Sequence, residues 1–339
     1  MGLKVTDSLA TGQVSPQPGA FDVYVGEGSA AGPAQPRLPL AFEPLLYLRP
    51  EHQALQPTRE PVRSFYAEDV AAGFSVAQLH VHLDPERGEA HSPGQAPFGT
   101  VQMAPGLSVT QVHRLLDAAE ASLRASSIQH LNLRGYPFAY DPAGAATLAE
   151  ALRQRGYRVS QAEQNYHLST ARDYEAHLHP SERRRLQKCR RHGLHVEQEP
   201  AYLLPAAYAF MRQCRQERGQ ELSLPLERVQ ELFKRFPREH LLFSVREPGG
   251  GWAAMTVAIQ VSRQVLYNFY PASPLRCNHL SPVVQLNEGL HALARASGMA
   301  LVDLGTSTLD TGPNASLLRF KRHLGGVAGL RLSWTKNLS

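Results

Sequence analysis

The sequence has few cysteines and no long apolar segment, and both absences narrow the possible classes of protein. Only Cys189, Cys214 and Cys277 occur in 339 residues, and no two of them form a C-x-x-C pair. This spacing argues against a disulfide framework and against a zinc site built on thiolates. No run approaches the ~18 apolar residues of a membrane-spanning helix, and the first residues lack the apolar core of a signal peptide. We therefore expect a cytoplasmic protein without a membrane span.

Two catalytic signatures are also missing. The chain contains no Gly-x-Ser-x-Gly motif, which excludes one common hydrolase signature but not acyl transfer to an amine, because that reaction needs no protein nucleophile. "HVHLD" places His80, His82 and Asp84 at alternate positions of one predicted strand, a spacing that metals can use. Nothing nearby completes a site, and His177 and His179 have no better support. We therefore predict no metal.

The composition is that of an ordinary soluble protein with a mild basic excess. Hydrophobic residues make up 42% and charged residues 19%, enough for a core without disulfides. The formal net charge of +5 suits an anionic ligand such as CoA, a nucleotide or tRNA. The excess is uneven, because Ser181–Gly193 ("SERRRLQKCRRHG") holds six arginine and lysine residues.

Hydrophobic periodicity and turn residues predict alternating strands and helices, and therefore an α/β or α+β fold. In the first half we expect helices over 109–126 and 143–156 and strands over 76–81, 128–136 and 157–170. In the second half we expect strands over 264–271, 299–307 and 327–336 and helices over 281–298 and 314–326.

An internal repeat links the two halves. With an offset of 171 residues, "RASSIQHLNL" (Arg124–Leu133) falls on "RASGMALVDL" (Arg295–Leu304), each at the end of a helix and the start of a buried strand. Phe98 falls on Phe269, and we expect both in the strand before the helix. The agreement in element order indicates a tandem duplication. We assign 1–19 to a flexible N-terminus, 20–168 to the first copy and 169–339 to the second.

These segments resemble a known superfamily. The carriers are "HPSERRRLQKCRRHG", "YNFYPAS", "VVQLNEGLHALARASGMALVDLGTS" and "NASLLRFKRHLGG". Together they resemble the Fem-type peptidoglycan ligases and the related BioF-like acetyltransferases, in which a Lys follows a Phe in the last helix. The resemblance implies two tandem GNAT-like domains, each a mixed twisted sheet flanked by helices. It places the main site in the second domain, with ligand in the cleft between halves.

The resemblance implies an enzyme that transfers an acyl or aminoacyl group to a small-molecule or peptide amine. Its donor would be acyl-CoA or aminoacyl-tRNA. An acetyl-CoA-dependent N-acetyltransferase of a small amine is the alternative, and a non-catalytic binding protein that retains the fold is a third. The segment that should hold the CoA pyrophosphate, Ala272–Gln285, contains no glycine, and a Gly-poor loop brings its N–H groups to a phosphate less easily. This departure favours Fem-like chemistry or lost catalysis over acetyl-CoA.

Lys321 is the first candidate site residue. At roughly 100° per residue, Leu317, Phe320 and Leu324 form one apolar arc of the predicted helix, and Lys321 falls inside it. A buried ammonium needs a partner or a cavity, and an oxyanion or a phosphate would supply one. The alternative is a Lys whose stem lies along the helix while its head reaches water. We predict a catalytic Lys321 that faces the cleft, with Asn314 on the same helical face as a substrate-binding residue.

The strand Val265–Pro271 and the segment "LVDLG" supply further candidates. Strand alternation would put Asn268 and Tyr270 on one face and Tyr267 on the other. Tyr270 is a candidate proton donor to the leaving group, with Tyr267 and Asn268 as substrate-binding residues, although aromatic residues also build sheet cores. Asp303 has apolar neighbours on both sides and therefore needs a partner, either Lys321, a substrate amine or a structural ion pair.

Two helix features complete the prediction. Ser281, before Pro282, should cap the helix that follows it and bind substrate there. On the basic helix, Arg184, Lys188 and Arg191 share one face and could bind phosphates of CoA or tRNA, or could simply be solvated.

Overall fold

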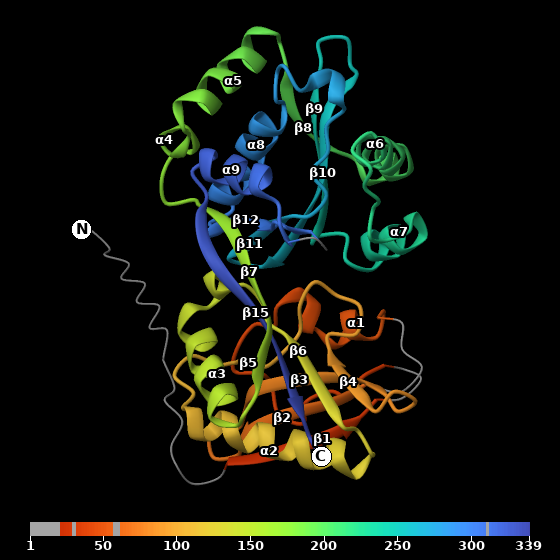
Figure 1. The fold of residues 1–339 in the computed structure, drawn as a ribbon, viewed down its shortest axis with the longest axis vertical. Helices are drawn as coiled ribbons and strands as arrows, with labels where there is room; N and C mark the ends of the chain where they lie inside the picture. The colour runs from red at the N-terminus through yellow and green to blue at the C-terminus, as the bar shows by residue number, and fades with distance from the viewer. Residues whose placement is uncertain (1–20, 29–31, 57–61, 310–311) are drawn as a thin grey trace, which may run out of the picture.

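The computed structural model describes residues 21–28, 32–56, 62–309 and 312–339, and it shows two lobes stacked along the long axis of the molecule (Figure 1). One large mixed sheet runs through both lobes in the order β1-β2-β3-β4-β6-β15-β7-β12-β11-β10-β9-β8, with β5 paired to β3. No described helix is long and apolar enough to cross a bilayer.

The first half carries the following elements: β1 (Phe21–Glu27), η1 (Leu46–Leu48), α1 (Pro50–Gln53), β2 (Arg63–Asp69), β3 (Phe74–Asp84), β4 (Glu89–Ser92), β5 (Gln102–Met103), α2 (Val109–Ala125), β6 (His130–Arg134), η2 (Phe138–Tyr140), α3 (Pro142–Gln154) and β7 (Arg158–Ser169).

The second half continues with α4 (Tyr174–His177), α5 (Pro180–Arg191), β8 (His195–Glu199), η3 (Ala201–Leu203), α6 (Leu204–Gln216), α7 (Leu226–Arg235), β9 (His240–Arg246), β10 (Trp252–Ser262), β11 (Val265–Asn268), η4 (Leu275–Cys277), α8 (Val283–Ala296), β12 (Leu301–Thr306), β13 (Thr308–Leu309), β14 (Gly312–Pro313), α9 (Ala315–His323) and β15 (Val327–Asn337).

The two halves have the same strand order and the same pairing directions. In the first half β1, β2, β3 and β4 pair successively antiparallel, and β4 then pairs parallel with β6. In the second half β8, β9, β10 and β11 do the same, and β11 pairs parallel with β12. Leu131 lies opposite Ala90 on β4, and Val302, 171 residues later, lies opposite Leu266 on β11. The repeated pairing supports the proposed duplication.

One detail of the predicted repeat is wrong. Phe98 lies after β4 and Phe269 lies after β11, so neither residue is in a strand. In both halves the chain leaves the sheet at this point and returns to the preceding strand, through β5 to β3 and through Ala272 to Met255 on β10. An apolar run continues past the strand end because these residues pack into the core between the halves.

The last strands of the two halves cross the junction. β7 ends the first half but pairs with β12 of the second, and β15 ends the second half but pairs with β6 of the first. Along the junction β7 and β15 pair antiparallel with each other, from Val327 opposite His167 to Thr335 opposite Arg158 (Figure 1). The division at residue 168 remains our proposal, with the addition that each half receives its outer strand from the other.

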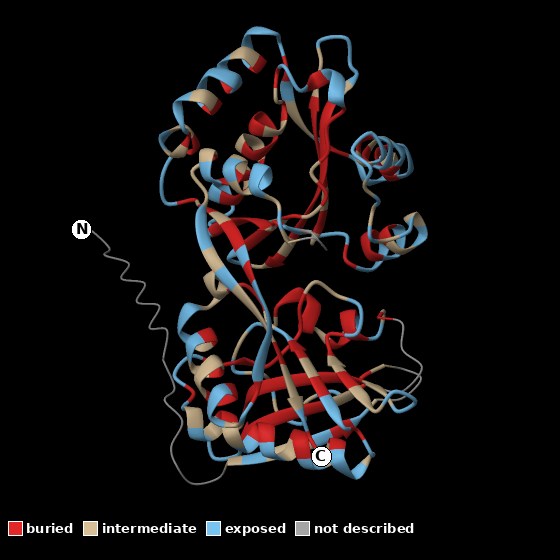
Figure 2. Cartoon of the chain, in the orientation of Figure 1, coloured by how far each residue is buried: buried red, intermediate tan, exposed pale blue. Residues whose placement is uncertain are grey.

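Three buried clusters form the core (Figure 2). One lies in the first half, where α2 packs Leu115, Leu116 and Leu123 against the sheet. This helix begins at a capping box in which Ser108 and Gln111 satisfy each other's backbone N–H groups. A second cluster lies in the second half under α8. The third joins η1 and η2 of the first half to α6, α7 and β10 of the second, so the junction is itself a core.

The crossed strand gives a test of this architecture. Trp334, 8% exposed, is on β15 but packs in the core of the first half. We expect Trp334→Ala to lower the free energy of unfolding by about 3–5 kcal/mol, as for other large-to-small core changes. Hydrogen exchange at β6 should accelerate, because β6 loses its packed neighbour.

The matched control is Val327→Ala at the other end of β15, where the side chain is 50% exposed and the loss should stay within about 0.5 kcal/mol. Loss of protection confined to the second half in Trp334→Ala would contradict the observed exchange of strands.

Candidate functional site

Asp303 lies in an irregular part of β12 at the junction between the halves. The register with β7 shifts between Asp303 and Thr306, and Gly305 adopts a φ of 72°, which favours glycine. A side chain at Gly305 would also meet the ring of Tyr267 at 3.3 Å. The bulge turns the Asp303 carboxylate toward the first half.

The Asp303 carboxylate is 2% exposed and accepts three hydrogen bonds. The Tyr140 hydroxyl on η2 donates at 2.5 Å, the Asn165 amide on β7 at 2.8 Å, and the Gly305 N–H at 2.7 Å. A carboxylate has about four acceptor positions, so one stays free for another donor. The predicted need for a partner is therefore met by three neutral donors from three elements.

Lys321 is buried, as its place in the apolar arc indicates. It is 5% exposed and its ammonium donates to the carbonyl oxygens of Gly305 at 2.8 Å and Thr306 at 2.7 Å. Lys321 and Asp303 thus hold the same bulge from two sides. Burial lowers the pKa of Lys321 from 10.5 to about 8, and the negative charge of Asp303 acts against this shift. One of its three N–H groups remains to donate.

The rest of the α9 arc is less buried than predicted. Leu317 is 36% exposed, Phe320 is half-buried, and Lys321 is the only fully buried residue within the helix. The helix covers the sheet only with its last turn, followed by buried Leu324. Asn314 caps this helix, because its side chain accepts from the Leu317 N–H at 3.1 Å and from the Ser316 hydroxyl at 2.8 Å. Its substrate-binding role stays a prediction.

Tyr267 and Tyr270 lie on the same side of the sheet, contrary to the alternation expected. Both belong to the junction core, whereas Asn268 points to the other side and donates to Asn287 on α8 at 3.1 Å. The Asn268 amide oxygen also accepts from Thr256 at 2.6 Å. Alternation holds only while the backbone is extended, and β11 ends at Asn268.

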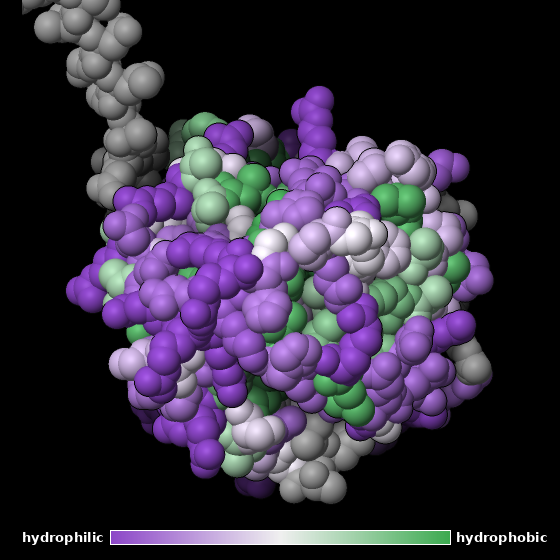
Figure 3. All heavy atoms as spheres, turned by 90° about the horizontal axis from the view of Figure 1, so that it is seen from above, coloured by the Kyte–Doolittle hydropathy of each residue, from purple (hydrophilic) through white to green (hydrophobic). Residues whose placement is uncertain are grey.

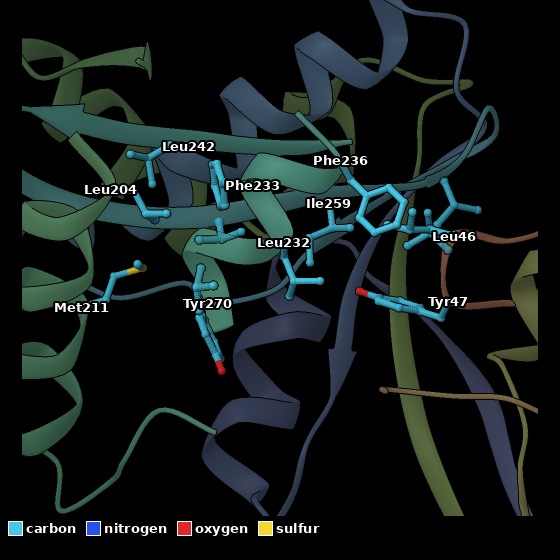
Figure 4. Close-up of a cluster of buried hydrophobic side chains, with 14 of the residues drawn as sticks. Leu46, Tyr47, Leu204, Met211, Leu232, Phe233, Phe236, Leu242, Ile259 and Tyr270 are labelled. Atoms are coloured by element: carbon cyan, nitrogen blue, oxygen red, sulfur yellow. The ribbon is translucent and has the colours of Figure 1, made fainter. Parts of the chain in front are cut away.

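An aromatic cluster surrounds Asp303 on the junction side (Figure 4). Its rings come from both halves and contact one another in sequence: Tyr47 with Phe98, Phe98 with Tyr140, Tyr267 with Phe269, and Phe269 with Tyr270. The Tyr270 hydroxyl is engaged with Ser223 at 2.6 Å and with the Leu224 N–H at 3.0 Å. The Tyr47 hydroxyl is buried and has no hydrogen-bond partner among the described residues.

Burial raises the pKa of Tyr47, Tyr140, Tyr267 and Tyr270 above the ordinary phenol value, with Asp303 adding to the shift for the first three. These phenols therefore stay protonated near neutral pH and act as donors. Tyr267, which is half-buried, is better placed than Tyr270 to serve a ligand, because the hydroxyl of Tyr270 already has two partners.

Ser281 does not cap α8. The cap position is Pro282, no side chain bonds the helix start, and Ser281 adopts a positive φ of 58°. A Ser-Pro pair resembles a cap in sequence, but a residue with positive φ cannot aim its hydroxyl into the first turn as a capping residue in the β region does. Its substrate-binding role stays a prediction.

The basic face of α5 lies at the far end of the second lobe, where hydrophilic side chains gather on the surface (Figure 3). Arg184 and Arg191 are exposed and have no ion-pair partner among the described residues. Lys188 is half-buried and donates to the carbonyl of His279 at 3.1 Å, in the loop before α8. The face is therefore two free cations and one that joins α5 to the glycine-free loop.

The histidines of "HVHLD" are structural. His80 bonds the Ser64 hydroxyl and His82 bonds Gln53, each at 2.8 Å, and burial lowers their pKa to about 3 and about 4. Among the described residues no three His, Cys, Asp or Glu side chains are grouped to hold a metal ion. His179 caps α5 and stacks on His323.

Sequence reasoning missed the residues that come from the first half. Tyr140 follows a loop, Asn165 is one polar residue in a mixed strand, and Tyr47 precedes a short helix. None carries a motif, because their role depends on the crossing of β7 and on the junction core. The only available signal was the "YPFAY" segment, whose aromatic residues have no alternation or helical period.

Comparison with solved structures shows the fold. No family model matches the chain, and no curated protein sequence is significantly similar to it. The structure of FemX superposes with a TM-score of 0.62 at 12% identity, covering 81% of this chain and 88% of FemX. L-PGS from Bacillus licheniformis gives 0.54 at 11%, covering 84% and 85%. A tandem GNAT protein from the clavulanic acid biosynthesis pathway gives 0.50 at 14%, covering 82% and 83%.

These likenesses confirm the predicted fold, a mixed α/β tandem GNAT-like architecture of the Fem type. At such identities they show the arrangement of the chain and not its reaction.

The buried ammonium predicts a specific pH dependence. Between the folded pKa of about 8 and the unfolded value of 10.5, the unfolded chain binds more protons than the folded one at Lys321. The free energy of unfolding should therefore rise with pH across that interval by more in the wild type than in Lys321→Met.

The comparison is made by urea unfolding of both proteins from pH 7 to 10.5, where titration of other groups cancels in the difference. Parallel curves would contradict a desolvated Lys321. At neutral pH the variant should itself be less stable by about 1–3 kcal/mol, because two buried carbonyls lose their donor.

Proposed function

We propose that this protein transfers an acyl or aminoacyl group to an amine, with Asp303 and Lys321 at the reacting centre. The observation that carries the proposal is the pairing of a buried carboxylate and a buried ammonium on one β-bulge, beside the end of the parallel pair β11–β12. Each keeps one free hydrogen-bonding position. A buried charge retained at such cost indicates a function beyond packing.

The two groups match the two charges of acyl transfer. The amine attacks the donor carbonyl, the C–S or C–O bond to the leaving group breaks, an amide forms, and the amine loses one proton while the leaving group gains one. The remaining acceptor position of Asp303 suits the attacking ammonium or amine. The remaining N–H of Lys321 suits the oxyanion, where one positioned donor contributes about 3 kcal/mol to lowering the barrier. Tyr267 is the phenol that can protonate the leaving group.

The donor we favour is aminoacyl-tRNA, with acyl-CoA as the alternative. The loop between β11 and α8 contains no glycine between residues 272 and 285, and no side chain caps the helix that follows. A loop of this kind is a poor pyrophosphate cradle. The free cations of α5, by contrast, suit a polyanion. The acceptor would be a small-molecule or peptide amine, reached on the junction side of Asp303.

Lys321→Met tests the reaction itself. We expect turnover of aminoacyl-tRNA or acetyl-CoA with an amine panel to fall by a factor of about 100 or more, because one transition-state donor is lost. Asp303→Asn should lower it comparably.

Arg322→Met is the matched control, since Arg322 is the exposed neighbour on α9 and should leave turnover unchanged. Wild-type turnover in Lys321→Met would reduce Lys321 to a support of the bulge. Ligand binding without any amide product would favour a binding protein that retains the fold.

Charge reversal on α5 tests the donor. We expect the double variant Arg184→Glu and Arg191→Glu to weaken aminoacyl-tRNA binding and to reduce the slope of log affinity against log salt by about 1.5, as expected for two lost phosphate contacts. Binding should be followed by thermal shift with CoA, acetyl-CoA and charged tRNA.

The control is the double variant of Arg87 and Arg153, two exposed arginines of the first half, which changes net charge equally. Equal salt slopes in both double variants would show that the α5 face is only solvated.

A further inference from the structure

A pocket of about 230 Å³ opens on the sheet of the first half, away from Asp303 and Lys321. Four strands line it, β4, β6, β7 and β15, so it exists only because the last strands cross the junction. Its polar walls come from His91, Asn132, Arg134, Ser160, Gln161 and Ser333. The volume corresponds to about seven waters, smaller than the pockets that take drug-sized ligands.

The pocket occupies the position in the first half that the Asp303 site occupies in the second. On the parallel pair β11–β12, Tyr267 lies opposite Asp303. On the parallel pair β4–β6, His91 lies opposite Asn132, and Asn132 precedes Asp303 by the 171 residues of the repeat. The crossing strands correspond too. Ser333 lies two residues before the partner of Asn132, as Asn165 lies two residues before the partner of Asp303.

The charges at the two positions are opposite. Asn132 stands where the second half has the Asp303 carboxylate, and Arg134 stands where it has Gly305. Arg134 has no ion-pair or hydrogen-bond partner in the described parts of the chain. Partial burial lowers its pKa, and the neighbouring cation Arg331 adds to this shift. The pocket thus holds an uncompensated positive charge.

The nearby acidic groups are already bound. Glu163 accepts from Arg331 at 3.0 Å and 2.5 Å, and Glu89 lies 3.0 Å from the His91 ring. The Ser333 hydroxyl, in the pocket wall, is buried without a hydrogen-bond partner among the described residues. A buried hydroxyl in that state needs a ligand or water to bond.

We propose that this pocket binds a small anion with a carboxylate or phosphate group, held by Arg134 with Asn132 and Ser333. A guanidinium presents paired N–H donors that match both groups. The pocket lacks a carboxylate facing it to take up a proton, so it serves as a binding site and not as a second transfer site. The proposal stands whether or not the second half transfers acyl groups.

The experiment is thermal shift of the full chain with sodium phosphate and, separately, sodium succinate at about 20 mM, with ionic strength held constant by sodium chloride. We expect at least one of the two anions to raise the melting temperature by about 2 °C or more. Arg134→Gln should abolish the rise. Asn132→Asp, which restores the negative charge of the other half, should abolish it as well.

Arg87→Gln is the control, because Arg87 is an exposed arginine of the same half outside the pocket. It should keep the wild-type response. A response to phosphate alone identifies a phosphate site, and one to succinate alone a carboxylate site. No rise with either anion, or an equal rise in Arg134→Gln, would overturn the proposal.

Discussion

The antiparallel pairing of β7 with β15 is the contact on which both candidate sites depend. Each of these strands ends one half of the chain and completes the sheet of the other, so neither sheet keeps its observed edge if the halves separate. The pairing brings Asn165 to Asp303 and Ser333 to the wall of the pocket near Arg134. Backbone hydrogen bonds along eleven- and twelve-residue strands thus position side chains that are far apart in sequence.

The same scaffold carries opposite charges in its two halves. In the second half Asp303 and Lys321 hold a bulge in β12 from two sides, and the junction core excludes water around them. In the first half the equivalent strand ends in Arg134, without a bulge-forming glycine, and the space beside it stays open. Duplication followed by exchange of a few side chains at the strand ends is enough to produce both arrangements.

Burial of Lys321 has two separable consequences. Its hydrogen bonds to the carbonyls of Gly305 and Thr306 stabilise the bulge, and its lowered pKa reports the cost of keeping a charge there. A purely structural residue would supply the first and gain nothing from the second. The proposed reaction uses the second, since a weakly solvated ammonium interacts more strongly with an oxyanion than a hydrated one does.

The predictions that succeeded rest on local rules. Element order, the repeat and the burial of Lys321 follow from periodicity, which reflects which face of a helix or strand meets the core. The predictions that failed extended those rules beyond the element. Alternation stops at Asn268 because β11 ends there, Ser281 does not cap because its φ is positive, and Leu317 is exposed because only the end of α9 covers the sheet.

The sequence by itself determined the α/β class, the doubled strand–helix–strand unit and the placement of a Lys on a buried helical face, since each depends on residues close together in the chain. Only the tertiary structure decided what that Lys contacts, which tyrosines surround Asp303, and that a basic pocket lies at the corresponding place in the first half. Those facts depend on β7 and β15 crossing between sheets. Strand pairing over such sequence separations is set by backbone hydrogen bonds that any residue except proline can make, so it leaves little trace in residue type.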